Sequence, residues 1–241
     1  MTGRGYRQAI VLAATRLKLQ TFEIMSTFPG SPHLIKGGIV LINPDTSAVE
    51  RIITLQYNPD TLTRTLQVQS ISNDSNNRSQ PLRLTGPPVE TLKLDVEIDA
   101  TDQLQIADPV TVKAGIQPQL AALETIIYPK SSQLLSNNSM ASMGALEIAS
   151  MESPLTLFIW NKNRILPVRI TDFSITEEAF DVNLNPIRAK VSLGMRVLSI
   201  DDLGFDHKGG SLFMSYQQNK ERLAGMFASG NLTDLGINVI P

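Results

Sequence analysis

Few residues of this sequence have the types and spacing that catalysis requires. The chain has no cysteine, so a thiolate nucleophile is excluded. With only two histidines, a histidine-based triad or a multi-histidine metal site would need distant parts of the chain to come together. His33 and His207 both lie in segments expected to be loops or extensions, and we interpret them as ordinary surface histidines. The Gly-Gly pairs at 37–38 and 209–210 lack the neighbours of a phosphate-binding loop. We therefore predict that the protein is not an enzyme and uses no cofactor.

The densest group of carboxylates lies along one predicted strand and just beyond it. Its members are Asp95, Glu97, Asp99, Asp102 and Asp108. Oxygen ligands of this kind bind hard cations. However, successive residues on one face of a strand lie about 7 Å apart, which is too far for one ion to bridge easily. We interpret the group as the charged face of a sheet and predict no metal site.

A second segment, at 188–197, carries the opposite charge at alternate positions. If the two strands lie side by side, in one subunit or across a subunit boundary, the charges would pair and help to set the register. The sequence leaves open the alternative that both faces are simply solvated. The candidate pairing residues are Asp95, Glu97 and Asp99 on one strand, and Arg188, Lys190 and Arg196 on the other.

The clearest strand signal is the strict alternation of apolar and charged residues from Leu92 to Asp99, which predicts a half-buried strand. Apolar runs at 38–42 and 49–57 flank Asn-Pro-Asp-Thr at 43–46 and predict a hairpin. The same four residues recur at 58–61 and predict another turn. Further strands are predicted at 62–68, 155–160, 165–173, 180–184 and 189–197.

Residues 155–160 are apolar on both faces of their predicted strand. A strand of this kind is covered on both sides. The cover is expected to come from the core of this protein or from a neighbouring subunit.

Two segments have helical periodicity. Leu120, Leu123 and Ile127 share one face of a short helix that Pro118 begins and Pro129 ends. The polar segments 72–88 and 130–153 are predicted to be loops. The second predicted helix is C-terminal, with an apolar stripe formed by Leu212, Tyr216, Leu223 and Phe227.

The composition is that of a globular protein, with 42% hydrophobic and 18% charged residues and a net charge of -2. The basic residues are scattered, so no nucleic acid partner is expected. An apolar run after Arg7 is interrupted at Arg16, so we predict no signal peptide. Direct membrane insertion is not expected either, because no segment approaches the roughly 20 apolar residues of a span.

The length of 241 residues fits one large domain with extensions. We predict an N-terminal extension at 1–36, a β domain at 37–200 and a C-terminal helical extension at 201–241. The expected fold is mainly β, with one short helix among the strands and a C-terminal helix.

Three short motifs, in this order and spacing, resemble those of baseplate and tube-initiator proteins of contractile injection systems, the phage-tail-like particles of bacteria. An aromatic-Asn-Pro turn follows an apolar strand, an alternating strand ends near Asp-x-Thr, and the final hairpin carries Pro-x-Arg-Ala. The resemblance covers roughly 37–200 and is to the tube-like domain of that family. It implies an antiparallel β-barrel or sandwich of the phage tail-tube type, with one short helix packed on it. The matching residues are Tyr57, Asn58, Pro59, Asp99, Thr101, Pro186, Arg188 and Ala189.

The resemblance implies a structural subunit that forms a ring, expected to be a homohexamer, between the spike hub protein and the inner-tube protein. Baseplate wedge proteins are further expected partners, with synthesis in the cytoplasm and assembly into a phage-tail-like particle. Many relatives carry a C-terminal LysM module, and residues 200–241 lack its pattern.

Two alternatives remain open to the sequence. In the first, the chain is an inner-tube subunit proper, which is stacked in many copies. A different class is a carbohydrate-binding β-sandwich, which is expected to expose aromatic side chains on a concave face. Aromatic residues make up only 5% of this chain, and this composition favours the structural subunit.

Overall fold

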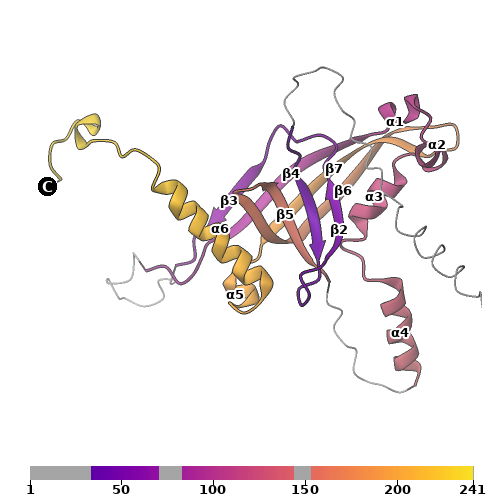
Figure 1. Ribbon diagram of the computed structural model, residues 1–241, viewed down its shortest axis with the longest axis horizontal. Coiled ribbons are helices and arrows are strands. Elements are labelled where there is room, and N and C mark those ends of the chain that lie inside the picture. The colour runs from indigo at the N-terminus through magenta and orange to yellow at the C-terminus, as the bar shows by residue number, and fades with distance from the viewer. Residues whose placement is uncertain (1–33, 71–82, 144–152, 241) are drawn as a thin grey trace, which may run out of the picture. The chain divides into compact units, whose positions relative to one another are not determined.

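The computed structural model describes residues 34–70, 83–143 and 153–240. The chain divides into two compact units, Met1–Leu34 and Ile35–Pro241, and nearly all described residues belong to the second. The predicted N-terminal extension, except its last few residues, and most of the predicted loop at 72–88 lie outside the described residues. The elements (Figure 1) are β1 Gly38–Ile42, β2 Val49–Thr54, β3 Thr63–Gln67, β4 Val89–Asp99, α1 Thr101–Gln105, α2 Pro109–Ala114, α3 Gln117–Glu124, α4 Ser131–Ser142, β5 Leu155–Asn161, β6 Arg164–Phe180, β7 Pro186–Val197, α5 Ile200–Leu203, α6 Lys208–Ala224 and the 3-10 helix η1 Leu232–Leu235.

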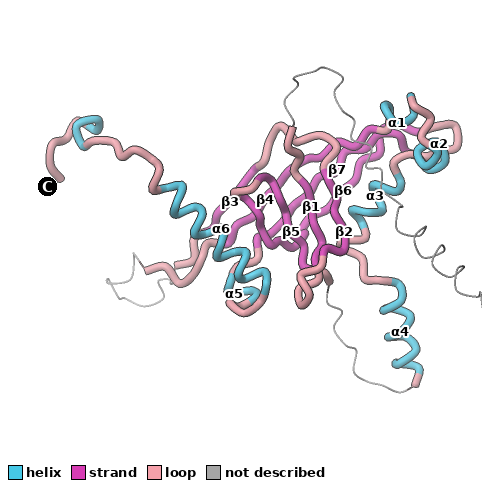
Figure 2. Tube along the Cα trace, in the orientation of Figure 1, coloured by secondary structure: helices cyan, strands magenta, loops and turns pink. Residues whose placement is uncertain are grey.

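The strands form one seven-stranded antiparallel sheet in the order β2-β1-β5-β6-β7-β4-β3, visible as the magenta region of Figure 2. This arrangement confirms the prediction of a mainly β, antiparallel fold. Antiparallel pairing lets short turns connect neighbouring strands, and β1-β2, β5-β6 and β6-β7 are connected in this way.

The sheet is strongly coiled. Gln56 follows the edge strand β2, yet its side chain spans the backbone of Asp99 at the end of β4. Its amide donates to the Asp99 carbonyl at 2.6 Å, and its carbonyl accepts from the Asp99 N–H at 3.0 Å. In a flat sheet β2 and β4 would lie about 24 Å apart, which is five strand spacings. The outer strand therefore curls back toward β4, and the residues that follow it help to enclose the core.

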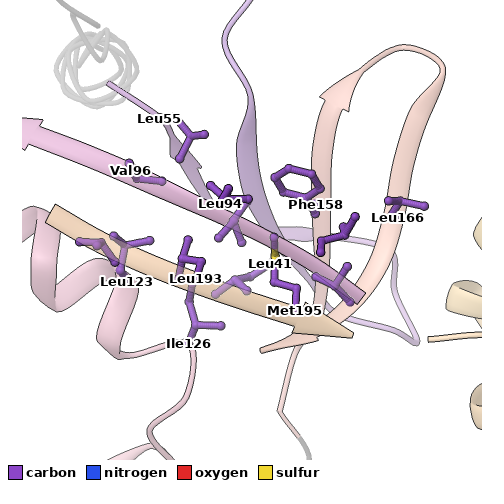
Figure 3. Close-up of a cluster of buried hydrophobic side chains, with 14 of the residues drawn as sticks. Leu41, Leu55, Leu94, Val96, Leu123, Ile126, Phe158, Leu166, Leu193 and Met195 are labelled. Carbon is purple, nitrogen blue, oxygen red and sulfur yellow. The ribbon is translucent and has the colours of Figure 1, made fainter. Parts of the chain in front are cut away.

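The core lies on the inner face of this coiled sheet. The alternation predicted for β4 is confirmed, because Leu92, Leu94, Val96 and Ile98 are all buried while Lys93, Asp95 and Glu97 are exposed. Apolar residues of β7 lie directly opposite in the register, and helix α3 adds its own apolar side chains. Figure 3 shows part of this cluster, including Leu94, Val96, Leu123, Ile126, Phe158, Leu193 and Met195.

Strand β5 is apolar on both faces because it is covered on both sides, as its sequence predicts. Phe158 belongs to the main core, where its ring stacks on that of Trp160 with centroids 6.0 Å apart. Leu157 faces a smaller cluster that includes Leu203 of α5 and Leu212 of α6. The cover on both sides thus comes from within this chain.

The two Asn-Pro-Asp-Thr sequences have different roles. Asn43 forms a local turn, in which its side-chain oxygen accepts hydrogen bonds from the N–H groups of Asp45 and Thr46. This turn joins β1 to β2, and the predicted hairpin is confirmed. The equivalent Asn58 instead accepts from the Gly37 N–H at 2.9 Å and donates to the carbonyl of Ile35. The second copy therefore holds the start of β1 rather than its own turn.

The helices differ from the prediction in number and length. Four helices, α1 to α4, lie between β4 and β5, where the sequence indicated one, and part of the predicted loop at 130–153 is α4. Helix α4 buries none of its residues. A helix that packs on nothing needs no apolar stripe, and without a stripe the sequence does not reveal it. Helix α3 is the predicted helix, but it ends at Glu124, and the following turns bury Ile126 and leave Ile127 exposed.

Two predicted strands, at 165–173 and 180–184, are wrong in their bounds. Strand β6 is continuous to Phe180 because β7 pairs with its polar second half, and the turn occupies 181–185. The carboxylate of Asp181 accepts from the N–H groups of Asn183 and Asn185 at 2.7 and 2.8 Å. These bonds hold a turn in which Leu184 has a left-handed φ of 64°.

Helix α6 packs on β6, and the first half of its predicted stripe is confirmed, because Tyr216 is buried and Leu212 packs against the smaller cluster. Phe213 and Tyr216 are buried, whereas Leu223 is exposed and Phe227 lies beyond the end of the helix. The reason is that the last turns of α6 extend past the sheet that would cover them. Among the described residues, no helix has the length and apolar character needed to cross a membrane.

Candidate assembly site

The candidate pairing charges lie on neighbouring strands. In the antiparallel register of β4 and β7, Glu97 lies opposite Lys190 and Asp99 opposite Arg188. Asp95 lies opposite Ser192, whose hydroxyl donates a hydrogen bond to it. The acidic face of one strand and the basic face of the other are therefore adjacent within a single subunit.

The ion pairs do not all follow the register. Arg188 binds Asp99 directly, with a guanidinium nitrogen 2.7 Å from the carboxylate oxygen, and lies 3.8 Å from Glu97. Lys190 binds Glu178 of β6 at 2.9 Å, although Glu97 is the residue opposite it. These side chains form one charged row that spans three strands rather than the predicted two. Its members are Glu97, Asp99, Arg188, Lys190 and Glu178.

Arg196 is not part of this row. It lies opposite Thr91, and its guanidinium binds Asp202 of α5 at 2.8 Å. Asp202 also accepts from the backbone N–H of Ser199 as part of a capping box. Arg196 thus secures the short helix after β7 and pairs with no carboxylate of β4.

Asp99 is the most highly connected carboxylate of the row. It accepts hydrogen bonds from the N–H of Thr101 at 2.7 Å, from the Thr101 hydroxyl and from Arg188. Burial by itself would raise the pKa of Asp99, but the Thr101 hydrogen bonds and the Arg188 charge outweigh it, so the pKa lies below its ordinary value. This carboxylate is therefore held in its charged form.

Five of the eight residues that carry the family resemblance lie at this end of β4 and β7. Asp99 and Thr101 join Arg188 through the contacts above, and Ala189 is buried beside them opposite Ile98. The carbonyl of Pro186 accepts from the N–H of Ile116 at 2.9 Å. Tyr57, Asn58 and Pro59 follow Gln56, whose side chain binds the Asp99 backbone.

Gly115, just after α2, permits a close approach between α2 and the start of β7. Its φ is 57°, and a Cβ atom there would lie 2.1 Å from the Pro186 carbonyl oxygen. No larger residue fits at that distance, and a side chain at this φ would also be strained. The contact fixes the turn after α2 against the start of β7.

A second polar cluster, which the sequence analysis did not predict, lies at the opposite end of β4. Glu90 is only 3% exposed, and its carboxylate binds Arg64 of β3 at 2.8 Å and Lys220 of α6 at 3.2 Å. The Tyr216 hydroxyl donates to Glu90 at 3.2 Å and accepts from Arg64 at 3.0 Å. The Lys220 nitrogen also lies 4.0 Å from the centre of the Tyr216 ring.

Burial raises the pKa of Tyr216 to about 12, and the negative charge of Glu90 adds to the rise. Ionisation of the phenol would place a second negative charge beside the buried carboxylate. The hydroxyl is therefore held as a hydrogen-bond donor. The cluster joins β3, β4 and α6 through one carboxylate.

Both outer strands of the sheet are open. No described strand pairs with the outer edge of β2 or of β3. Exposed apolar side chains lie on or beside these edges, at Val49, Ile52, Leu66 and Val68. An unpaired strand edge is a template for pairing with another strand.

The histidines and carboxylates of the described part of the chain do not gather into a metal site. Within that part, no group of three or more histidine or carboxylate side chains is placed to hold a metal ion. His207 has a structural role, since its Nδ1 accepts from the Gly209 N–H at 3.0 Å at the start of α6. His33 lies outside the described residues.

Comparison with protein families gives a match to the family described as contractile injection system tube protein, over residues 39–202. The match spans more than half of the chain and includes all seven strands apart from the first residue of β1. Comparison with curated proteins gives no match.

Proposed function

Because the chain belongs to the family of contractile injection system tube proteins, a structural family and not a class of enzymes, we propose that it is the baseplate subunit that initiates the tube. In this role it forms a ring, expected to be a homohexamer, that adapts the spike hub to the inner tube. Its partners are further copies of itself, the spike hub protein, the inner-tube protein and baseplate wedge proteins. Synthesis and assembly in the cytoplasm belong to the same proposal.

The open edges of the sheet are the observation that carries the ring. A ring closes when identical subunits contact one another head to tail, so each subunit must offer two different surfaces. Strands β2 and β3 lie at the two ends of the strand order and offer such a pair. Contact between β2 of one subunit and β3 of the next would cover both edges and their exposed apolar side chains.

The elements outside the sheet support the adaptor over a repeating subunit. Helix α4 buries none of its residues, and the segment 221–240 is exposed throughout. That segment includes large apolar side chains, among them Met226, Phe227 and Leu235. Exposed apolar residues on extensions favour contacts with other proteins. A subunit that forms a single ring per particle can place such extensions against several different neighbours.

The inner-tube subunit is the second candidate, and the family description itself favours it. A repeating tube protein needs only the compact sheet domain. Every layer of the tube would then have to accommodate α4 and the C-terminal segment. The two candidates share a fold and a ring, and they differ in the number of rings per particle.

Electron microscopy of particles produced from this gene and its neighbours tests the proposal. One ring of this chain per particle, next to the spike hub, is expected for the adaptor. Many stacked rings would show instead that the chain is the tube subunit. A chain that remains monomeric and absent from every particle would contradict both.

The role of the extension is tested by a double substitution of Met226 and Phe227 by serine, with Val182→Ser as the matched control on an exposed apolar residue of the β6-β7 turn. The adaptor role predicts rings that form normally but no longer enter the particle in the extension variant. Normal incorporation would show that this segment makes no essential contact.

A further inference from the structure

A groove of about 320 Å³ lies where α6 crosses the sheet end that contains Glu90. Arg64, Arg164 and Lys220 line it, together with polar side chains from the β5-β6 turn and α6. No acidic residue is among the described residues that line it. The groove is thus a recess with cationic and amide groups on its walls.

The charges around this groove do not balance. Arg64 and Lys220 share the single buried carboxylate of Glu90, and their side chains are 28% and 32% exposed. Within the described residues, no carboxylate lies within 4.0 Å of Arg164. Three cations thus face one carboxylate, which leaves an excess of two positive charges in a recess. A recess with one sign of charge concentrates ions of the opposite sign.

The side chains that line the groove favour a carboxylate over a nucleotide as the bound group. The guanidinium of Arg164 has a planar fork that suits bidentate binding of a carboxylate or a phosphate. The aromatic ring in the lining, that of Tyr216, belongs to a residue only 5% exposed and has the Lys220 nitrogen 4.0 Å from its centre, so it offers no free face for a base. The side chains of Asn161 and Asn163 can bind the peptide groups of a bound segment.

We infer that this groove binds an acidic segment of a neighbouring protein subunit, with Arg164 as the residue that receives a carboxylate. The chain belongs to a family whose members assemble with other proteins, so a protein carboxylate is the occupant with the matching charge. Arg64 and Lys220 add to the attraction but stay bound to Glu90. The inference holds whether the chain is the adaptor or the repeating tube subunit, because both contact neighbours.

Binding of a fluorescein-labelled octaglutamate peptide to the full chain, followed by fluorescence anisotropy at low ionic strength, tests the inference. Arg164→Gln is expected to weaken binding about tenfold or more, since a hydrogen bond to a charged group contributes about 1.5–3 kcal/mol. The matched control is Arg169→Gln, an exposed arginine of the same strand that does not line the groove, and it should bind like the unaltered chain. Thermal unfolding of both variants checks that they fold.

Equal weakening by the two variants, or no binding by the unaltered chain, would overturn the inference. Competition by inorganic phosphate separates the two sources of anion. If phosphate displaces the peptide at the same concentration of anionic groups, the groove is a small-anion site and the peptide assignment is wrong. The binding experiment does not depend on the number of rings per particle, so the groove inference can fail while the adaptor proposal stands.

Discussion

Strand β4 carries a charged cluster at each end, and the two differ mainly in burial. At one end Glu90 is almost completely buried, and three side chains from β3 and α6 converge on its carboxylate. At the other end Asp99 is held by Thr101 and by Arg188, whose side chain is 46% exposed. Both clusters contain a close ion pair, but Glu90 is the more deeply buried carboxylate, with a side chain 3% exposed against 12% for that of Asp99.

The difference shows which charges hold the fold together. A surface ion pair exchanges water for a partner and gains little. A buried carboxylate has little water available as a substitute, and its loss leaves its partly buried cations without their partner. We therefore expect the Glu90 cluster to dominate stability and the β4-β7 row to adjust the register.

The largest expected effect is that of Glu90→Gln. The substitution leaves Arg64 and Lys220 without their carboxylate and should lower the free energy of unfolding by about 3 kcal/mol, the lower end for a buried pair, because both cations can turn partly toward solvent. Urea denaturation measures it. Glu97→Gln, the same change on the exposed face of the same strand, is the control. A loss no larger than that of the control would mean that burial does not separate the two clusters.

The second effect concerns alkaline pH. An unfolded tyrosine ionises near the ordinary tyrosine pKa of 10.0, whereas folded Tyr216 has a pKa of about 12 and keeps its proton up to that pH. Between these values the unfolded state binds fewer protons, so the stability that is present below pH 10.0 is lost as the pH rises. Stability curves of the unaltered chain should fall more steeply than those of Tyr216→Phe in this range. Parallel curves would contradict the raised pKa.

The third effect is at acid pH and at the other end of β4. Since the pKa of Asp99 lies below the ordinary aspartate value of 3.8, its contribution is present above that pH and is lost as the pH falls through the folded pKa. Asp99→Asn should therefore reduce the loss of stability at acid pH. At neutral pH it should lower the free energy of unfolding by less than half as much as Glu90→Gln does. Arg188→Met, which retains the Thr101 hydrogen bonds, should reduce the acid loss of stability only in part. If it removes the whole pH dependence, the ion pair alone lowers the pKa of Asp99.

The smallest effect is expected for the opposed pair Glu97 and Lys190. Reversing them singly and together, as Glu97→Lys and Lys190→Glu, should give a double variant close to the sum of the single ones in thermal unfolding. The reason is that Lys190 already binds Glu178, and Glu97 lies nearer to Arg188. A double variant clearly more stable than that sum would show that the pair in register is the one that matters.

The two clusters also differ in how far the sequence reveals them. Alternation between Leu92 and Asp99 places charges on one face of β4, and the opposite alternation on β7 indicates a partner. Glu90 was overlooked although its position contains a signal, since it has the same parity as Leu92 and Leu94 and so lies on the buried face. A carboxylate on an apolar face needs cationic partners. Those partners lie 26 and 130 residues away in the sequence, and only packing identifies them.

The sequence alone determined the features that depend on near neighbours: the alternating strands, the β1-β2 hairpin, the helix that begins near Pro118, and the scarcity of catalytic residues. Tertiary structure decided the features in which distant segments compete for the same groups. It assigned Asn43 to its own turn and Asn58 to the start of β1, although both stand in the same four-residue sequence. It also made β6 one continuous strand, because pairing with β7 supplies the backbone hydrogen bonds that its polar half cannot specify by itself.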